Sequence, residues 1–114
     1  MNKHIEKLYN SAKKPSRLVI GLMSGTSLDG LDVALCKIAG QGSDTKVELL
    51  EFTTVDYTQN YKSKIKSVFA KRQVDLQQVT LLHPWVGVLH GQMVNQCLAD
   101  WGVQAAEIDA IASH

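Results

Sequence analysis

Apolar and polar positions alternate in short runs over the first half of the chain. Residues 17–22 form a compact apolar run rich in β-branched side chains, which is the pattern of a buried strand. Two further runs, residues 31–38 and 46–54, repeat the pattern, with a glycine-containing break at residues 40–44 between them. Because the turns between the runs are short, the pattern predicts an antiparallel meander of three strands.

The period becomes helical in the second half. Apolar residues recur at helical spacing over residues 61–69 and again over residues 75–101, where Gly102 predicts the end of the helix. Pro84 lies inside the second pattern and predicts a kink or a fresh helix start, because proline has no amide hydrogen to donate. Residues 108–113 form a fourth apolar run, expected to be parallel to an earlier strand because a helical crossover leads to it. The predicted fold is α/β, with the order β-β-β-α-β.

The leader before the first strand, together with the composition, limits the range of partners. Residues 3–12 predict a short amphipathic helix that Pro15 ends, and the leader lacks the apolar stretch of a secretory signal, so a cytoplasmic protein is expected. A hydrophobic fraction of 45% and a mean hydropathy of −0.08 are typical of a folded domain. The formal charge of +1 predicts no binding of nucleic acid by bulk attraction. The apolar runs are shorter than the roughly 20 residues of a membrane helix, so no membrane partner is expected.

Four side chains in the long helical pattern have both a structural and a functional interpretation. His83 and His90 are seven residues apart and share a helix face, but a metal site needs three or four ligands and no partner stands at a useful spacing. Trp85 and Trp101 follow the apolar stripe of the helix approximately, so packing is favoured over a sugar-stacking platform.

Chemically informative residues concentrate in residues 21–32, Gly-Leu-Met-Ser-Gly-Thr-Ser-Leu-Asp-Gly-Leu-Asp. The glycines allow the backbone to approach a ligand and the hydroxyls add donors, so the segment suits the phosphates of a nucleotide. It is not a Walker A loop, since Leu31-Asp32 stands where Lys-Ser/Thr is required, and it misses the G-x-S-x-G nucleophile elbow by one position. Asp29-Gly30 between two apolar runs is also a hairpin-turn signal, and spacing alone leaves both interpretations open.

Two segments resemble a known family. Residues 21–34 closely resemble the first phosphate-binding hairpin of the anhydro-N-acetylmuramic acid kinases, and residues 108–114, Ile-Asp-Ala-Ile-Ala-Ser-His, resemble the start of their later Ser-His-Gly-Gln-Thr segment. The resemblance covers nearly the whole chain from Arg17 and hardly any of the leader. It implies an actin-like (ribonuclease H-like) ATPase fold of two lobes, with ATP and Mg²⁺ in the cleft between them. Residues 1–16 would then be a leader, and residues 17–114 the incomplete N-terminal lobe.

The resemblance also implies a set of site residues. The ATP-binding stretch of the family falls on Gly25, Thr26, Ser27, Leu28, Asp29, Gly30, Leu31 and Asp32. The amides of Gly25 to Ser27 and the hydroxyls of Thr26 and Ser27 are expected to bind phosphate oxygens. Asp29 is a candidate for holding a magnesium ion through a water, or for tying the turn through its own backbone, and Asp32 is the weaker candidate. His114 is a candidate for the substrate side of the cleft.

The activity that the resemblance implies is that of an ATP-dependent sugar kinase. The family opens the 1,6-anhydro bond of anhydro-N-acetylmuramic acid with water at C1 and phosphorylates O6, giving N-acetylmuramic acid 6-phosphate in peptidoglycan recycling. It places the catalytic base and the adenosine pocket beyond His114, so this chain alone is expected to be inactive, and it implies a homodimer for the full-length protein.

Two alternatives to the kinase remain open. The chain could be a non-catalytic nucleotide- or sugar-binding module of the same superfamily, or the glycine loop could be only a turn. A reading frame that continues after His114 with Gly-Gln-Thr and a later catalytic aspartate favours the enzyme, whereas a true stop codon favours the module.

Overall fold

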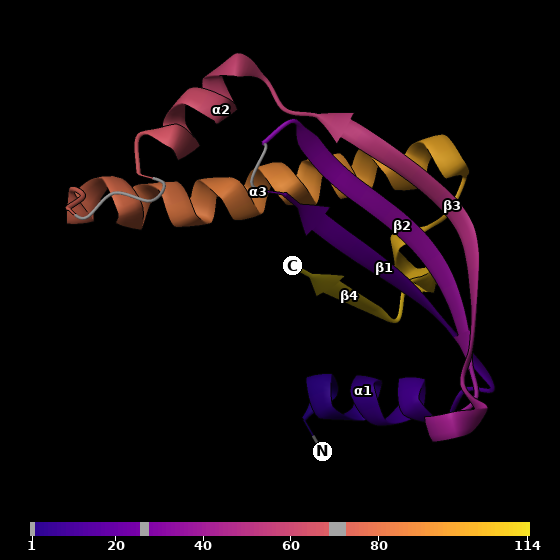
Figure 1. Cartoon of the computed structure of the whole chain (residues 1–114). Helices are drawn as coiled ribbons and strands as arrows, with labels where there is room; N and C mark the ends of the chain where they lie inside the picture. The colour runs from indigo at the N-terminus through magenta and orange to yellow at the C-terminus, as the bar shows by residue number, and fades with distance from the viewer. Residues whose placement is uncertain (1, 26–27, 69–72) are drawn as a thin grey trace.

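The computed structural model describes residues 2–25, 28–68 and 73–114, and its centre is a mixed sheet of four strands in the order β3-β2-β1-β4. The strands are β1 (Ser16–Ser24), β2 (Gly30–Ala39), β3 (Lys46–Asp56) and β4 (Ala110–Ser113). The first three pair antiparallel, and β4 pairs parallel to β1 (Figure 1). The predicted meander and the predicted parallel fourth strand are both confirmed.

In the described part of the chain three α-helices accompany the sheet: α1 (Lys3–Lys13), α2 (Gln59–Lys66) and α3 (Leu76–Trp101). Two short 3₁₀ turns, η1 (Gly42–Asp44) and η2 (Ala105–Glu107), lie in the connections. α3 begins at Asp75, whose carboxylate accepts from the Gln77 amide at 2.9 Å, and ends at Gly102, which is left-handed at φ 68°. Both ends match the sequence prediction.

Pro84 lies inside α3 without dividing it. The helix runs through Pro84 as a single element of 26 residues, so the predicted fresh start at this position is wrong. The proline removes one amide from the hydrogen-bond ladder, at a cost of about 3 kcal/mol. The remaining turns of so long a helix keep their own hydrogen bonds, and these offset the loss. Across the residues that the structure describes, no helix is both long enough and apolar enough to cross a membrane.

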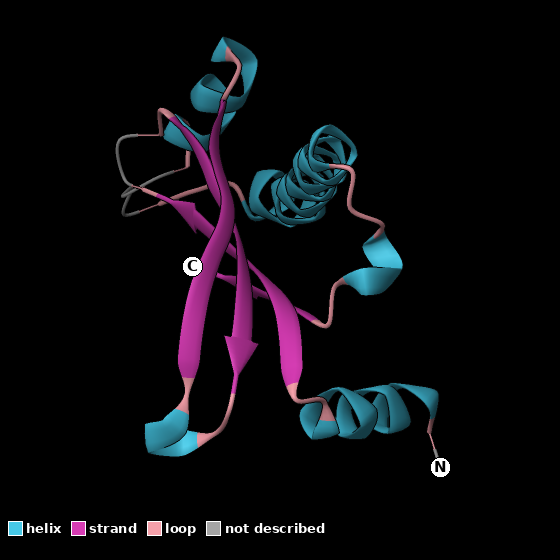
Figure 2. Cartoon of the chain, turned by 90° about the vertical axis from the view of Figure 1, so that its right-hand side faces the viewer, coloured by secondary structure: helices cyan, strands magenta, loops and turns pink. Residues whose placement is uncertain are grey.

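The core lies between one face of the sheet and the C-terminal half of α3. Ile20 of β1 and Leu31 and Val33 of β2 are at most 1% exposed, and they belong to one cluster with Val94 and Leu98 of α3. Figure 2 shows α3 nearly end-on beside this face of the sheet. Trp85 and Trp101 pack against the same cluster, as the sequence predicts.

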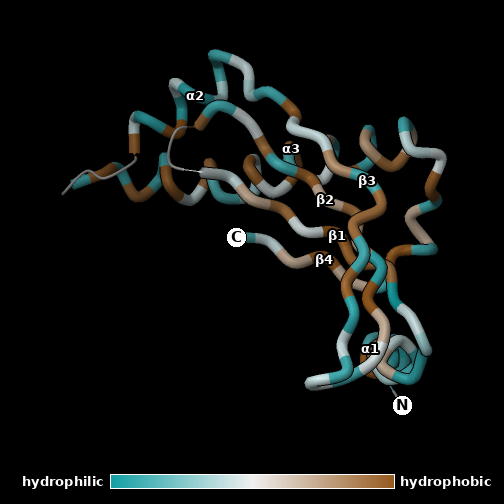
Figure 3. The backbone as a smooth tube through the Cα atoms, turned by 45° about the vertical axis from the view of Figure 1, so that its right-hand side comes forward, coloured by the Kyte–Doolittle hydropathy of each residue, from teal (hydrophilic) through white to brown (hydrophobic). Residues whose placement is uncertain are grey.

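The opposite face of the sheet is more exposed. Met23 and Asp32 form a cross-strand pair on this face, and Ala34 and Phe52 form another. Met23 is 54% exposed and Phe52 is 56% exposed, although both are large apolar side chains. Figure 3 shows the apolar positions distributed along the strands. Gly21 lies on the same face, where an added Cβ would meet no atom within 4 Å.

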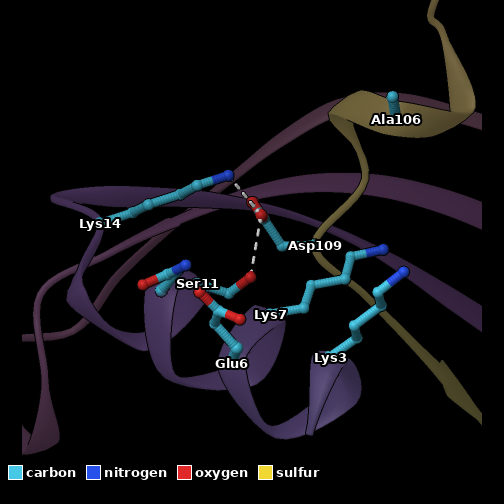
Figure 4. Close-up of a pocket in the computed structure, with 8 residues that line it drawn as sticks. Lys3, Glu6, Lys7, Ser11, Lys14, Ala106 and Asp109 are labelled. Carbon is cyan, nitrogen blue, oxygen red and sulfur yellow. Dashed lines mark hydrogen bonds and ion pairs between the residues drawn. The ribbon is translucent and has the colours of Figure 1, made fainter. Parts of the chain in front are cut away.

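The carboxylate of Asp109 links the leader helix α1 to the sheet. Asp109, one residue before β4, accepts from Lys14 Nζ at 2.5 Å and from Ser11 Oγ at 3.3 Å (Figure 4). It also accepts from the Leu18 amide at 3.0 Å. The side chain of Asp109 is only 8% exposed, whereas that of its partner Lys14 is 48% exposed. The hydrogen bond from Lys14 is the largest cause that lowers the pKa of Asp109 below its ordinary value, and the Leu18 amide adds to it.

Replacing Asp109 with Asn is expected to destabilise the chain by about 1–2 kcal/mol at pH 7, because hydrogen bonds to a charged acceptor are lost. A carboxylate with a lowered folded-state pKa stabilises the fold above its unfolded pKa, near 3.9, and loses this contribution as the pH falls through the folded value. The difference between wild type and Asp109→Asn in urea unfolding should therefore shrink between pH 7 and pH 3. The exposed Asp44 provides the control Asp44→Asn. A difference that is the same at both pH values would contradict this account.

Candidate functional site

The glycine- and hydroxyl-rich segment forms the loop between β1 and β2. β1 ends at Ser24 and β2 begins at Gly30, so residues 25–29 make the connection. Since β1 and β4 are parallel, the loop lies at the edge of the sheet where the carboxyl ends of both strands meet (Figure 1). Thr26 and Ser27 lie outside the described residues, so the roles predicted for their hydroxyls and amides stay predictions.

The turn that joins the two strands differs from the hairpin alternative. A two-residue Asp29-Gly30 turn would need positive φ at both positions, but the described glycines with positive φ are Gly40, Gly42 and Gly102. Gly30 instead pairs with Asp56 as the first residue of β2. β1 and β2 are antiparallel neighbours as in a hairpin, but the turn does not lie at Asp29-Gly30, because residues 25–29 connect the two strands.

Leu28 anchors the loop. Its side chain is 8% exposed and its amide donates to the Gly25 carbonyl at 3.2 Å. Its φ of 56° is left-handed, which is costly for a residue with a Cβ, and burial of the leucine side chain offsets that cost. Gly25 itself is exposed. Within the loop, the Leu28 side chain is thus buried, whereas Gly25 faces solvent.

The acidic residues of the segment differ in how they are engaged. Asp29 is exposed, and among the described hydrogen bonds only its backbone carbonyl takes part, accepting from the Tyr57 amide at 3.1 Å. The carboxylate of Asp32 accepts from Thr54 Oγ1 of β3 at 2.6 Å, on the more exposed face of the sheet. Of the two, Asp29 is therefore better placed for a magnesium-bound water. The side chain of Leu31 is in the core, so only its backbone could face a ligand.

His114 lies next to the start of the loop. Its amide donates to the Leu22 carbonyl at 2.9 Å, and its carbonyl accepts from the Ser24 amide at 3.3 Å. The side chain of His114 is exposed. The structure thus brings this candidate for the substrate side to the same edge as the β1–β2 loop.

Tyr57 is a site residue that the sequence did not indicate. It directly follows β3, is 5% exposed, and its hydroxyl donates to Ser24 Oγ at 2.8 Å. The same hydroxyl oxygen is 3.0 Å from Nε2 of His90 on α3. Its partners are each 33 residues away in sequence, so no local pattern could have indicated these contacts.

His90 has a structural partner in Tyr57. Its burial lowers the pKa of the imidazole below the ordinary value, so the ring is neutral at pH 7. Because the Tyr57 proton goes to Ser24, the neutral tautomer with a proton on Nε2 can donate to the Tyr57 oxygen. A hydrogen-bond chain therefore runs from α3 through Tyr57 to the first residue before the loop.

These features place the protein in the α/β class, with a candidate anion-binding loop at one end of the sheet. A mixed α/β sheet presents a glycine- and hydroxyl-rich loop at the carboxyl ends of two parallel strands, with a helix packed on one face. Loops in that position, with backbone amides free to turn toward a ligand, are where α/β proteins commonly bind anionic groups.

Comparison with known proteins gives the family. The family model described as anhydro-N-acetylmuramic acid kinase matches residues 17–114, and the chain belongs to this family. The chain is 78% identical over 114 residues to the anhydro-N-acetylmuramic acid kinase of Pseudoalteromonas atlantica (strain T6c / ATCC BAA-1087) and 69% identical to that of Pseudoalteromonas translucida (strain TAC 125). It is 37% identical over 110 residues to the enzyme of the same name from Caldanaerobacter subterraneus subsp. tengcongensis.

These matches cover most or all of this chain but little of each relative. They include 100% of the chain for the two Pseudoalteromonas proteins and 96% for the Caldanaerobacter protein, and 28% of each relative. The chain therefore spans about 28% of the length of the curated relatives it matches. The family resemblance from Arg17 onward is confirmed by the family model, and the Pseudoalteromonas alignments also include the leader, residues 1–16.

Proposed function

We propose that this chain is the N-terminal part of an ATP-dependent kinase that converts anhydro-N-acetylmuramic acid to N-acetylmuramic acid 6-phosphate. The observation that carries the proposal is family membership over residues 17–114 together with 78% identity to a protein of that name. We place residues 1–16 as a leader and residues 17–114 as part of an actin-like (ribonuclease H-like) ATPase lobe. The strand order β3-β2-β1-β4, with a parallel fourth strand reached through helices, supports this lobe.

The β1–β2 loop is the proposed contact with the ATP phosphates. The eight residues from Gly25 to Asp32 are the proposed ATP-binding residues. The amides of Gly25 to Ser27 and the hydroxyls of Thr26 and Ser27 supply donors, which is the donor set that phosphate oxygens require. The exposed carboxylate of Asp29 suits a water of a Mg²⁺ ion, which prefers oxygen ligands and keeps several of its waters. His114, at the same edge, is the proposed residue on the sugar side.

The proposed reaction transfers the γ-phosphoryl group of Mg-ATP to O6 of the sugar. The C1–O6 bond of the anhydro sugar breaks as water adds at C1, O6 takes the phosphoryl group, and ADP leaves. Phosphoryl transfer depends mainly on positioning and charge stabilisation, and a loop that presents amides to the phosphates would contribute to both. The general base that activates water is proposed to lie beyond His114. A homodimer in the cytoplasm is proposed for the full-length protein on the family resemblance alone.

The test is an assay of the purified full-length protein with Mg-ATP and anhydro-N-acetylmuramic acid. ADP release coupled to a product of the mass of N-acetylmuramic acid 6-phosphate is expected, with one ADP formed per sugar phosphorylated. Release of ADP without the sugar, or phosphorylation of other amino sugars at the same rate, would contradict the proposal. Binding of Mg-ATP without any turnover would instead favour the non-catalytic module.

A further inference from the structure

Tyr57 contacts both ends of the β1–β2 loop. On the side of β1, its hydroxyl donates to Ser24 Oγ at 2.8 Å. On the side of β2, its backbone amide donates to the Asp29 carbonyl at 3.1 Å. Ser24 directly precedes the loop and Asp29 is its last residue, so a single residue spans the two points between which the loop is held.

Tyr57 is itself rigidly held. Its ring stacks on Tyr61 with centroids 4.1 Å apart and an interplanar angle of 25°, and its plane is nearly parallel to that of the His90 ring, at 11°. The tyrosine is 5% exposed and belongs to the main core cluster. The hydroxyl of a side chain packed in this way has little freedom, so its bond to Ser24 holds the residue before the loop in a fixed position relative to the core.

The Ser24 hydroxyl is engaged in this contact. Three hydroxyls lie in or beside the loop, on Ser24, Thr26 and Ser27. With Ser24 Oγ accepting from a buried tyrosine, its part in the site is to fix the backbone from which Gly25 starts. A loop that must present amides to phosphate oxygens gains from such support, because misplaced donors lose most of their value.

We infer that Tyr57, backed by His90, is a positioning residue that holds Ser24 and Asp29, at the two ends of the β1–β2 loop, for the binding of nucleotide phosphates. This inference rests on the proposed function. Tyr57 touches no phosphate itself and acts through Ser24 and Asp29. Loss of its hydroxyl should therefore weaken binding of ATP while leaving the binding of the sugar unchanged.

The experiment compares Tyr57→Phe with wild type in the full-length kinase. The variant keeps the stacked ring and the backbone bond to Asp29, and removes only the hydroxyl. The KM for Mg-ATP is expected to rise about three- to tenfold, as for loss of one shielded hydrogen bond. The KM for the anhydro sugar should change by less than about twofold, because Tyr57 acts on the loop proposed to bind the phosphates of ATP.

Tyr61→Phe is the matched control. It removes the same atom from the neighbouring stacked ring, whose hydroxyl is 3.4 Å from His90 Nε2 and does not contact Ser24 in the described structure. The KM for Mg-ATP should stay within about twofold of wild type. An equal rise in Tyr57→Phe and Tyr61→Phe would show that the effect is one of packing and would overturn the inference.

Ser24→Ala removes the other half of the contact and completes a double-mutant cycle. The double variant Ser24→Ala/Tyr57→Phe should have a KM for Mg-ATP no higher than the larger of the two single values, since both changes break one bond. Independent, multiplying effects would overturn the inference, as would an unchanged KM in both single variants. If Tyr57→Phe does not fold, Ser24→Ala alone decides by the same ATP-specific rise. A wild-type protein without kinase activity would refute the proposed function, which is a separate result.

Discussion

The 114-residue chain on its own is expected to give no turnover of Mg-ATP with anhydro-N-acetylmuramic acid. The chain spans about 28% of the length of its relatives and supplies one strand-end loop. The proposed reaction also requires an oriented acceptor and a base that takes a proton from the water adding at C1, and we propose that this base lies beyond His114. Without these groups, a phosphate loop can contribute binding but cannot align the reacting atoms.

ADP release and product mass are measured for the 114-residue chain. Its molar concentration is the one at which the full-length protein converts all of the anhydro sugar. The full-length protein in the same buffer is the positive control, and heat-denatured chain sets the background. Product above that background, formed in proportion to the concentration of the chain, would contradict the prediction and would place a base within these residues.

Gly30→Ala is expected to damage both the fold and the loop. A Cβ at Gly30 would lie 2.7 Å from the Val55 carbonyl oxygen and 2.9 Å from Thr54 Cγ2. The first of these atoms belongs to the backbone of β3, so the strands must move apart where β2 begins. Overpacking of this kind costs about 1–3 kcal/mol. Because Gly30 directly follows the loop, the shift should also misplace the loop's hydrogen-bond donors. The KM of the full-length protein for Mg-ATP should therefore rise by about tenfold or more.

The matched control is Gly21→Ala in the neighbouring strand β1. A Cβ at Gly21 meets no atom within 4 Å, and alanine without strain costs less conformational entropy than glycine. Urea unfolding of the 114-residue chain should show Gly21→Ala at or slightly above wild type and Gly30→Ala clearly below it. Equal stability of the two variants would contradict the steric argument.

Local signals account for most of the fold that the sequence predicts. The alternation of residues 31–35 predicts which face of β2 is buried, and the structure has Leu31, Val33 and Leu35 in the core. The limits of α3 were predictable because a capping aspartate and a left-handed glycine act within one turn of the helix end. The predicted fresh helix start at Pro84 was wrong, because the tolerance of one missing hydrogen bond depends on the whole helix and not on the proline alone.

Contacts between distant segments explain what the sequence did not indicate. β3 is long enough to place Tyr57 beside Ser24, and α3 places His90 next to the Tyr57 hydroxyl. Asp29-Gly30 is a strong local turn signal, but pairing with Asp56 draws Gly30 into β2. Such outcomes depend on strand register, which a single sequence does not specify locally.

The central claim is that the β1–β2 loop binds the phosphates of ATP, and the most direct test separates phosphates from the nucleoside. Isothermal titration of the full-length protein should be done with Mg-ATP and with adenosine, for wild type and for Thr26→Ala/Ser27→Ala. The account predicts that the double variant binds Mg-ATP about tenfold or more weakly, as expected for two lost charge-assisted hydrogen bonds, and binds adenosine as wild type does. Unchanged affinity for Mg-ATP, or an equal loss for both ligands, would contradict it.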